Sequence, residues 1–162
     1  MADVSANLVQ GPAGFWILPG IYDGSLSSLQ TLVCTNTHRR ALWEKIDRFI
    51  AWAPLAQFSH LYFTGAMLSS EERPPHTDLI LKTKDPYGPA SFAAMEPFFS
   101  AGLGEIRTRY AINLRFWIEN APAQLADYRS RRAQPEAAQK TPVDPAHITV
   151  RISLADQRSA SF

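Results

Sequence analysis

The sequence predicts an α+β domain built on a mixed sheet of about four strands, flanked by helices and preceded by an extended N-terminal arm. The chain has 162 residues, which is the size of one domain. Apolar residues make up 46% and charged residues 19%, as in packed globular proteins. Segments with strand-like composition alternate with segments of helical period, and this order is typical of a mixed sheet.

Residues 1–24 are interpreted as the extended arm. Glycine and proline recur through this segment, which excludes a regular helix. Its aromatic residues, including Phe15 and Trp16, are expected to pack onto the domain. The uncharged run over residues 4–22 lacks the continuous apolar length of a membrane helix, and Asp3 stands where a signal peptide has basic residues. The sequence therefore predicts a cytoplasmic protein without a membrane segment.

Two helices are predicted after the arm. Ser25 or Ser27 can cap a short helix that ends at Val33, and residues 35–37 offer caps for a longer helix that ends before Pro54. Apolar residues of the longer helix recur at steps of three and four and so share one face.

The paired arginines Arg39 and Arg40 lie at the start of that longer helix. We interpret them as a solvated helix start. Positive charge near a helix N-terminus opposes the helix dipole, however, which indicates another role such as contact with a phosphate or a partner.

The folded domain is expected to span residues 25–154. Strands are predicted over residues 58–64, 77–84, 110–118 and 147–154. Helices are predicted over residues 90–108, with a break near Pro97, and over residues 121–132. Residues 133–146 have the composition of a flexible loop, and residues 155–162 that of a tail.

Charge and cysteine content exclude several function classes. Sixteen Lys and Arg residues stand against fifteen Asp and Glu residues, so no basic surplus favours binding to duplex nucleic acid. Cys34 is the only cysteine, which excludes an internal disulfide or a cysteine-based zinc site and fits a reducing compartment. The sequence contains no Walker loop, dinucleotide fingerprint or serine-hydrolase elbow.

One passage has a pattern that suits phosphate chemistry. The strand over residues 58–64 runs into Gly65, a polar loop follows through Pro74-Pro75-His76, and the next strand opens with Thr77-Asp78. Glycine lets a backbone approach a phosphate closely. Two carboxylates two positions apart on a strand would point to the same face and could hold metal ions.

This passage resembles the nucleotidyltransferase fold of the polymerase-beta type, in which a strand ends in Gly-Ser and the next carries Asp-x-Asp. More narrowly, the chain resembles a family of small nucleotidyltransferase-like proteins. The motifs that carry the resemblance are Ile17-Leu18-Pro19-Gly20-Ile21, His38-Arg39-Arg40, Gly65-Ala66-Met67, Pro74-Pro75-His76-Thr77-Asp78, Tyr110-Ala111-Ile112-Asn113 and Ala146-His147-Ile148.

The resemblance implies a nucleotide-binding turn at Gly65 and Ala66, with Ser69 and Ser70 as substitute hydroxyl donors. It further implies a metal and catalytic site at Asp78, with His76 and Asn113 at the other two ligand positions.

The departures from the family pattern indicate a degenerate site. Ala66 replaces the serine, His76 the first aspartate, and Asn113 the third carboxylate. Mg²⁺ prefers oxygen ligands, whereas imidazole suits other metals. The loss of two negative charges also removes most of the attraction for dications. We therefore expect a protein that needs no cofactor and acts by binding.

The favoured function is binding of a partner protein or a nucleotide. Relatives of the fold occur in toxin–antitoxin and defence settings, which the resemblance suggests as a context. One alternative is an active enzyme in which Asp78 works with Glu71 or Glu72 and uses Mg²⁺ or Mn²⁺ with a nucleotide. Another is a structural subunit of an assembly. The partner, the nucleotide and the oligomeric state stay open.

Simpler interpretations of the individual residues also stay open. Gly65 can serve only to end a strand. Asp78 can be a strand acid paired with a lysine or arginine, and His76 can be a solvent-facing loop residue.

Overall fold

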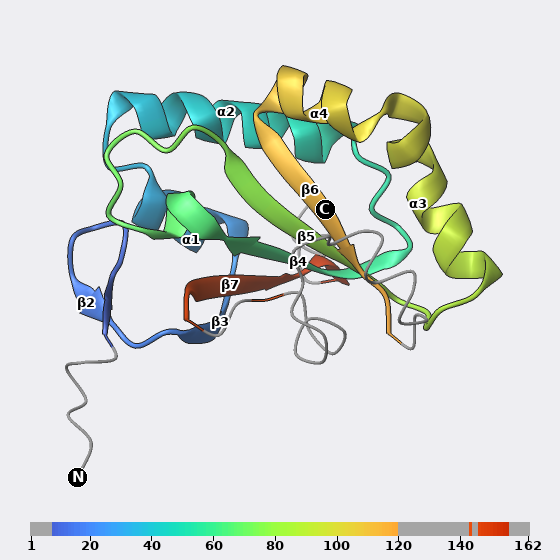
Figure 1. Ribbon diagram of the computed structural model, residues 1–162, viewed down its shortest axis with the longest axis horizontal. Helices are drawn as coiled ribbons and strands as arrows, with labels where there is room; N and C mark the ends of the chain where they lie inside the picture. The colour runs from blue at the N-terminus through green and yellow to red at the C-terminus, as the bar shows by residue number, and fades with distance from the viewer. Residues whose placement is uncertain (1–7, 120–142, 144–145, 156–162) are drawn as a thin grey trace, which may run out of the picture.

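The centre of the molecule is a five-stranded mixed sheet, shown in Figure 1. The computed structural model describes residues 8–119, 143 and 146–155. The strands are β3 (Gly20–Gly24), β4 (Phe58–Thr64), β5 (Thr77–Thr83), β6 (Ile112–Trp117) and β7 (Ile148–Ser153), in the order β3-β7-β4-β5-β6. β4 is antiparallel to β5 and β7, whereas the pairs β3–β7 and β5–β6 are parallel. This confirms the α+β class with a mixed sheet, but the sheet has five strands rather than four.

The additional strand, β3, lies within the segment predicted as an extended arm. It pairs with β7, where Gly20 is opposite Ile148 and Gly24 is opposite Ile152. A small hairpin of β1 (Val9–Gln10) and β2 (Trp16–Ile17) precedes it. The partner strand lies at the other end of the chain, so no local pattern in the glycine-rich segment indicates the pairing.

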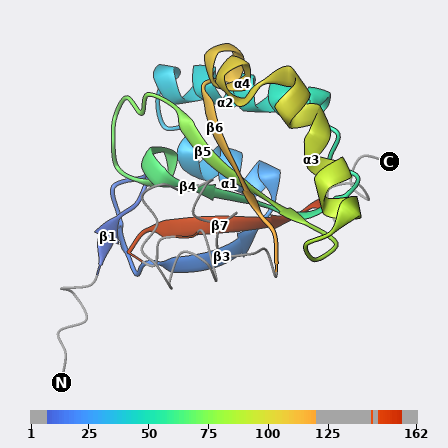
Figure 2. The ribbon, with the colours of Figure 1, turned by 45° about the vertical axis from the view of Figure 1, so that its right-hand side comes forward.

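Four α-helices lie on one side of the sheet (Figures 1 and 2). They are α1 (Leu26–Val33), α2 (Thr37–Trp52), α3 (Pro89–Ala101) and α4 (Leu103–Tyr110). The Ser25 side chain accepts a hydrogen bond from the Ser28 backbone and caps α1, and Asn36 caps α2 through the backbone of Arg39. Both helix starts therefore confirm the predicted caps. No helix in the described ranges is long and apolar enough to cross a bilayer.

The predicted helix over residues 90–108 is interrupted at Gly102 and not near Pro97. Pro97 lies inside α3, whereas Gly102 ends α3 and begins α4 with a φ of 89°. Glycine adopts this left-handed region without strain because it has no Cβ. Pro97 removes one backbone donor and crowds the carbonyl four residues earlier, yet α3 continues through it to Ala101.

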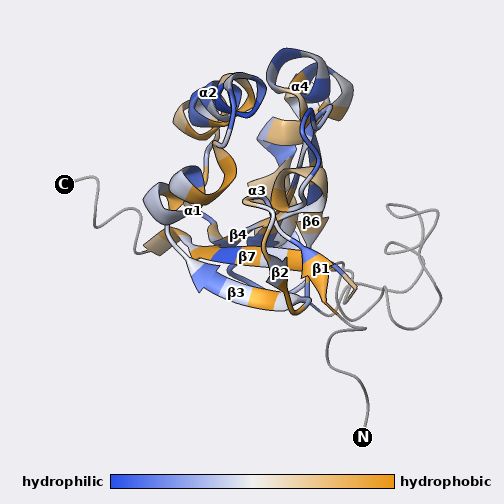
Figure 3. Cartoon of the chain, turned by 90° about the vertical axis from the view of Figure 1, so that its left-hand side faces the viewer, coloured by the Kyte–Doolittle hydropathy of each residue, from blue (hydrophilic) through white to orange (hydrophobic). Residues whose placement is uncertain are grey.

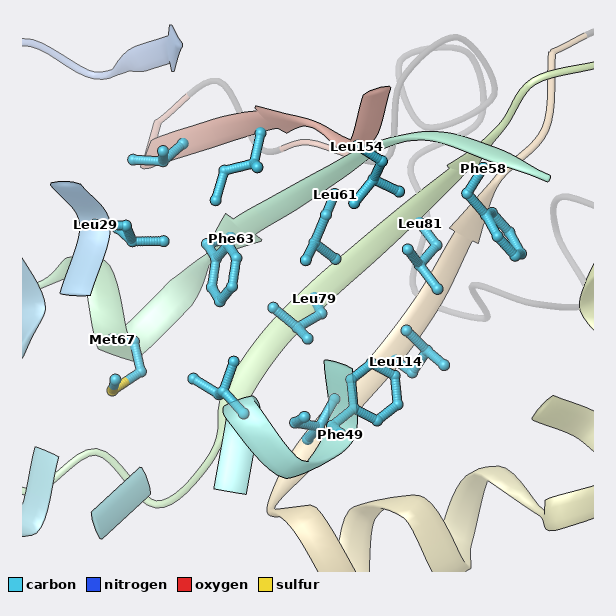
Figure 4. Packing of buried hydrophobic residues seen from close by; sticks show 14 of the residues in the cluster. Leu29, Phe49, Phe58, Leu61, Phe63, Met67, Leu79, Leu81, Leu114 and Leu154 are labelled. Carbon is cyan, nitrogen blue, oxygen red and sulfur yellow. The ribbon is translucent and has the colours of Figure 1, made fainter. Parts of the chain in front are cut away.

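The core lies between the sheet and the helices, as Figure 4 shows. Leu61 and Phe63 of β4 and Leu79 and Leu81 of β5 are buried there against residues from all four helices. The intervening residues of the same strands point to the opposite face. There Tyr62 and Ile80 form a second, smaller cluster with Val143 and Trp117.

Several predicted segments lie outside the described residues. These are the helix predicted over residues 121–132, most of the loop over residues 133–146 and the tail beyond residue 155.

Candidate functional site

The pairing of the strands brings three polar positions to one edge of the sheet. Thr64, the last residue of β4, is opposite Asp78 of β5, and Asp78 is in register with Asn113 of β6. Paired residues of neighbouring strands point to the same face. This face is the one opposite the helices, and His76 joins it from the segment just before β5.

His76, Asp78 and Asn113 form one hydrogen-bonded group. The Asn113 Nδ2 atom donates to Asp78 Oδ1 over 3.2 Å and contacts His76 Nε2 at 2.9 Å. The His76 Nε2 atom lies 3.4 Å from Asp78 Oδ1, and the two side chains are 24% and 22% exposed. One side-chain nitrogen, Asn113 Nδ2, thus contacts both of the other two residues. The three positions assigned to the metal site by resemblance therefore do converge.

This geometry also decides between the simpler interpretations of two residues. His76 does lie in the loop before β5, but it is only 24% exposed and contacts Asn113, so it does not simply face solvent. The hydrogen bond recorded for the Asp78 carboxylate comes from Asn113, in place of the lysine or arginine considered from the sequence.

Gly65 makes room for the Asp78 carboxylate. A Cβ atom at position 65 would collide with Asp78 Oδ2, and the backbone φ of 79° itself disfavours other residues. One carboxylate oxygen therefore lies against the Gly65 backbone, while the other accepts from Asn113. Gly65 has a steric function in the site in addition to ending β4.

The Arg39 guanidinium fixes the turn after Gly65. Its side chain is only 1% exposed, so the expected solvated helix start is wrong for this residue. Its three nitrogens donate to backbone carbonyl oxygens of Val33, Ala66, Met67, Ser69 and Glu71, at 2.6 to 3.3 Å. Burial lowers the pKa of Arg39 from its usual value, and the nearby Glu71 charge opposes this shift. The signal in the sequence was a cation in the first turn of a helix.

Two neighbours of Arg39 hold the rest of the loop in the same way. The Asn36 amide donates to the Glu72 carbonyl at 2.8 Å, and His38 Nε2 contacts the Pro74 carbonyl at 2.7 Å. The first turn of α2 thus binds the loop from the 3-10 helix η2 (Gly65–Leu68) to Pro74. The backbone that borders the site is therefore fixed to the helix layer.

The predicted loop hydroxyls and acids contribute little to the site. The Ser69 hydroxyl donates to the Ala66 carbonyl and accepts from the Glu71 backbone, and neither Ser69 nor Ser70 lines the pocket described next. Ala66 does not line it either. Over residues 8–119, 143 and 146–155, no three His, Cys, Asp or Glu side chains gather closely enough to hold a metal ion, so Glu71 and Glu72 do not join Asp78.

A pocket of about 520 Å³ opens beside the hydrogen-bonded group. The lining residues are Thr64, Gly65, Asp78, Asn113, Leu114, Arg115 and His147. Sequence analysis did not select Arg115 or His147 as site residues. Arg115 follows Asn113 by two positions on β6, so strand alternation was the available signal. His147 precedes β7, and only the tertiary pairing brings it here.

The donor set does not fit a pair of magnesium ions. The group supplies one carboxylate, one imidazole and one amide whose nitrogen faces the other two side chains. Mg²⁺ requires near-octahedral oxygen ligands and is usually held by carboxylates. The group therefore offers one carboxylate where a pair of magnesium ions would need several.

The comparisons with known proteins place the chain in a family. No curated protein matches it, and no solved structure does. The model of a family of unknown function, DUF6932, matches residues 13–141, which include Arg39, Gly65, Asp78 and Asn113. Since this match covers most of the chain, the protein belongs to the DUF6932 family of unknown function.

Proposed function

We propose that this protein has a nucleotidyltransferase-like fold with a degenerate active site and acts by binding a nucleotide in the pocket beside Gly65 and Asp78. The order of elements supports the fold assignment. β4 runs into Gly65, a loop leads to Asp78 on the antiparallel β5, and Asn113 lies next to it on β6. These are the relative positions at which the resemblance places the phosphate turn and the three ligand residues.

The proposed loss of transfer activity rests on the contacts that the Asp78 carboxylate already makes within the protein. Asn113 donates to one carboxylate oxygen, and the Gly65 backbone lies against the other. A catalytic aspartate of this chemistry needs its oxygens free to bind cations. Here the single acid is held by an amide donor, and neither neighbouring position supplies a second negative charge.

The pocket supports a nucleotide as the ligand. Its volume lies within the range of small-molecule sites, about 300–1,000 Å³. Arg115 lines it and is exposed, so its guanidinium can donate two parallel hydrogen bonds to a phosphate. Because arginine stays positively charged, Arg115 can neutralise a phosphate without a metal ion. We therefore expect nucleotide binding that does not depend on divalent cations.

Calorimetric titration with ATP, GTP, CTP and UTP, in EDTA and in Mg²⁺, tests the proposal. At least one nucleotide is expected to bind with the same affinity in both buffers. Arg115→Ala is expected to weaken binding by about tenfold or more, because a charge-assisted contact of 1.5 kcal/mol or above is lost. Arg48→Ala, which removes an exposed arginine of α2, is the matched control and should leave affinity unchanged. Failure of all four nucleotides to bind would contradict the proposed ligand.

Product analysis tests the loss of catalysis separately. The protein is incubated with each nucleotide and Mg²⁺ or Mn²⁺, and pyrophosphate and modified protein are measured. No turnover is expected. Metal-dependent transfer that Asp78→Asn abolishes would show that the site is active.

Restoring the missing carboxylates gives a further prediction. In a variant with His76→Asp and Asn113→Asp, three carboxylates converge where one does now, and their charge attracts dications. We expect this variant to bind Mn²⁺ in an electron paramagnetic resonance titration much more tightly than the natural protein does. Gln30→Glu with Gln57→Glu, which adds two acids at exposed positions outside the pocket lining, is the control for general charge effects.

A further inference from the structure

We infer that this protein forms a two-fold symmetric homodimer in which the β3 strands of two copies pair antiparallel, with the β1–β2 hairpins packed beside them. This inference concerns a surface other than the pocket lining and does not depend on the proposed nucleotide. Three features of residues 15–24 lead to it: exposed apolar side chains, an open strand edge and the absence of cations.

The segment from Phe15 to Tyr22 exposes an apolar surface. Phe15 is 73% exposed and Trp16 64%, followed by Leu18 at 48%, Ile21 at 45% and Tyr22 at 41%. Figure 3 shows hydrophobic colour on β1 and on part of β3 in this region. Side chains of this size expose together about 500 Å². Ile21 and Tyr22 are consecutive residues of β3 and point to opposite faces of the sheet, so the exposed side chains flank the strand edge on both sides. A standard interface buries about 800 Å² per partner, and extension of the sheet at this edge would bury side chains on both faces.

The outer edge of β3 has unused backbone groups. β3 is the last strand in the sheet order, with β7 on its inner side. The Gly20 backbone donates to the His147 carbonyl, so alternate residues from Gly20 onward bond to β7. In a parallel pair, the intervening residues, Ile21 and Asp23, direct both N–H and C=O away from the sheet. Among the described strands β3 pairs with β7 alone, so these four groups lie on an open edge, and such an edge is a template for strand addition.

Charge argues for a second copy of the chain as the occupant. Residues 1–37 contain no Lys, Arg or His, so this segment adds no positive charge of its own that would attract a nucleic acid or an anionic lipid surface. Its acid, Asp23, accepts two hydrogen bonds from Arg151, at 2.6 and 3.0 Å. Two such surfaces can therefore meet without unpaired like charges.

A two-fold axis at Tyr22 satisfies both edges at once. Ile21 of one copy then pairs with Asp23 of the other, and the reverse pair is identical. Each pair exchanges two N–H···O=C bonds, and the two Tyr22 residues form the narrow, non-hydrogen-bonded pair between them. The Tyr22 hydroxyl donates to the Leu18 carbonyl at 2.6 Å, which fixes its ring beside the hairpin. The two five-stranded sheets become one continuous sheet.

A second exposed apolar surface on α3 is less suited to self-association. Phe92 and Phe99 are exposed on this helix with Glu96 between them. Antiparallel contact of two α3 helices about a two-fold axis at the centre of this face would place the two Glu96 carboxylates together. The surface around β3 has no such conflict.

Light scattering coupled to size exclusion, from about 1 to 100 µM protein, tests the inference in the range where small interfaces associate. We expect a mass approaching twice 18.1 kDa as the concentration rises. Ile21→Pro removes one outward N–H and leaves the bonds to β7 intact, because proline is tolerated where its nitrogen faces out of a sheet. It is expected to give a monomer.

Two further variants separate the apolar surface from the strand edge. Trp16→Glu places a charge in the exposed apolar surface and is expected to give a monomer, whereas Phe92→Glu changes the second exposed surface, on α3, and should leave the dimer intact. Circular dichroism verifies that each variant is folded.

Hydrogen exchange gives a readout at the strand itself. The amides of Ile21 and Asp23 are expected to become protected as protein concentration rises, while that of Tyr22, which faces β7, is protected throughout. A monomeric mass at the highest concentration would overturn the inference. So would a dimer that survives Ile21→Pro and Trp16→Glu but is lost in Phe92→Glu.

Discussion

The two faces of the central sheet are made by alternate residues of the same strands, yet they differ in chemistry. On the helix face, Leu79 and Leu81 are fully buried in the apolar core. On the opposite face, Asp78 lies with His76 and Asn113 in a hydrogen-bonded group beside a pocket. One strand, β5, therefore contributes to stability through every second residue and to the candidate site through the residue between.

We therefore expect substitutions one position apart on β5 or β6 to differ in their effect on the free energy of unfolding. On the core face, a lost side chain leaves a cavity. On the site face, it changes hydrogen bonds that are close to water. The following predictions test that separation, beginning with the largest change in the free energy of unfolding.

Leu79→Ala is expected to lower the free energy of unfolding by about 2–5 kcal/mol, because a fully buried leucine leaves a cavity. Asn113→Ala, its counterpart on the site face, should lower it by about 1 kcal/mol, the typical value of a lost hydrogen bond. Urea unfolding measures both. Equal losses from the two variants would break the proposed separation of the faces.

Arg39→Met is expected to cost about 3 kcal/mol, since removal of the buried guanidinium leaves the carbonyls of the loop after Gly65 without their donor. Arg40→Met is the matched control, because the neighbouring arginine is exposed and should change stability by about 0.5 kcal/mol or less. Thermal and urea unfolding give the comparison. A loss for Arg40→Met as large as that for Arg39→Met would contradict the assigned contacts.

Gly65→Ala is expected to cost about 2 kcal/mol through backbone strain at positive φ, and to displace the Asp78 carboxylate. Gly104→Ala is the control, because it is expected to raise the free energy of unfolding. Gly104 lies in α4 with open space around a Cβ, so alanine there should stabilise the helix by about 0.5–1 kcal/mol. If Gly65→Ala is neutral, the close contact between Gly65 and Asp78 is not maintained in solution.

The smallest expected effect concerns the exposed ion pair of Asp23 and Arg151. The hydrogen bond from Arg151 lowers the pKa of Asp23 below its ordinary value of 3.8. A lowered folded-state pKa stabilises the protein above the unfolded-state pKa, and this contribution is lost as the pH falls through the folded-state pKa. Asp23→Asn should therefore be slightly less stable than the natural protein at neutral pH, and the difference should vanish in acid. A difference that grows on acidification would contradict this sign.

Local chemistry made much of the sheet and the site predictable from the sequence. The strand over residues 58–64 is found at the predicted bounds, and the short polar side chains of Ser25 and Asn36 cap the two predicted helices. The notable exception is His76, which lies just before β5 and reaches Asp78 through its contact with Asn113. The resemblance adds Asn113. This residue lies beside Asp78 because β6 pairs parallel to β5, and the pattern within either strand does not specify that pairing.

The parts that sequence analysis missed depend on contacts between distant segments. β3 consists of a five-residue segment with glycine at both ends, and its identity as a strand comes from β7. Arg39 is buried because a loop some thirty residues away presents carbonyl oxygens to it. His147 reaches the pocket through the same long-range pairing. In each case the contacting segment is far away in the sequence, so residue type alone predicts a more exposed position.

The location of β7 has a consequence for biosynthesis. β7 lies between β3 and β4 in the sheet, although it is the last of the five strands to be translated. β3 therefore emerges from the ribosome without its neighbour, and one edge of β4 stays uncovered until residues 148–153 are made. The nascent chain must keep these edges from wrong pairing until then, because the sheet cannot be completed before residues 148–153 have left the ribosome.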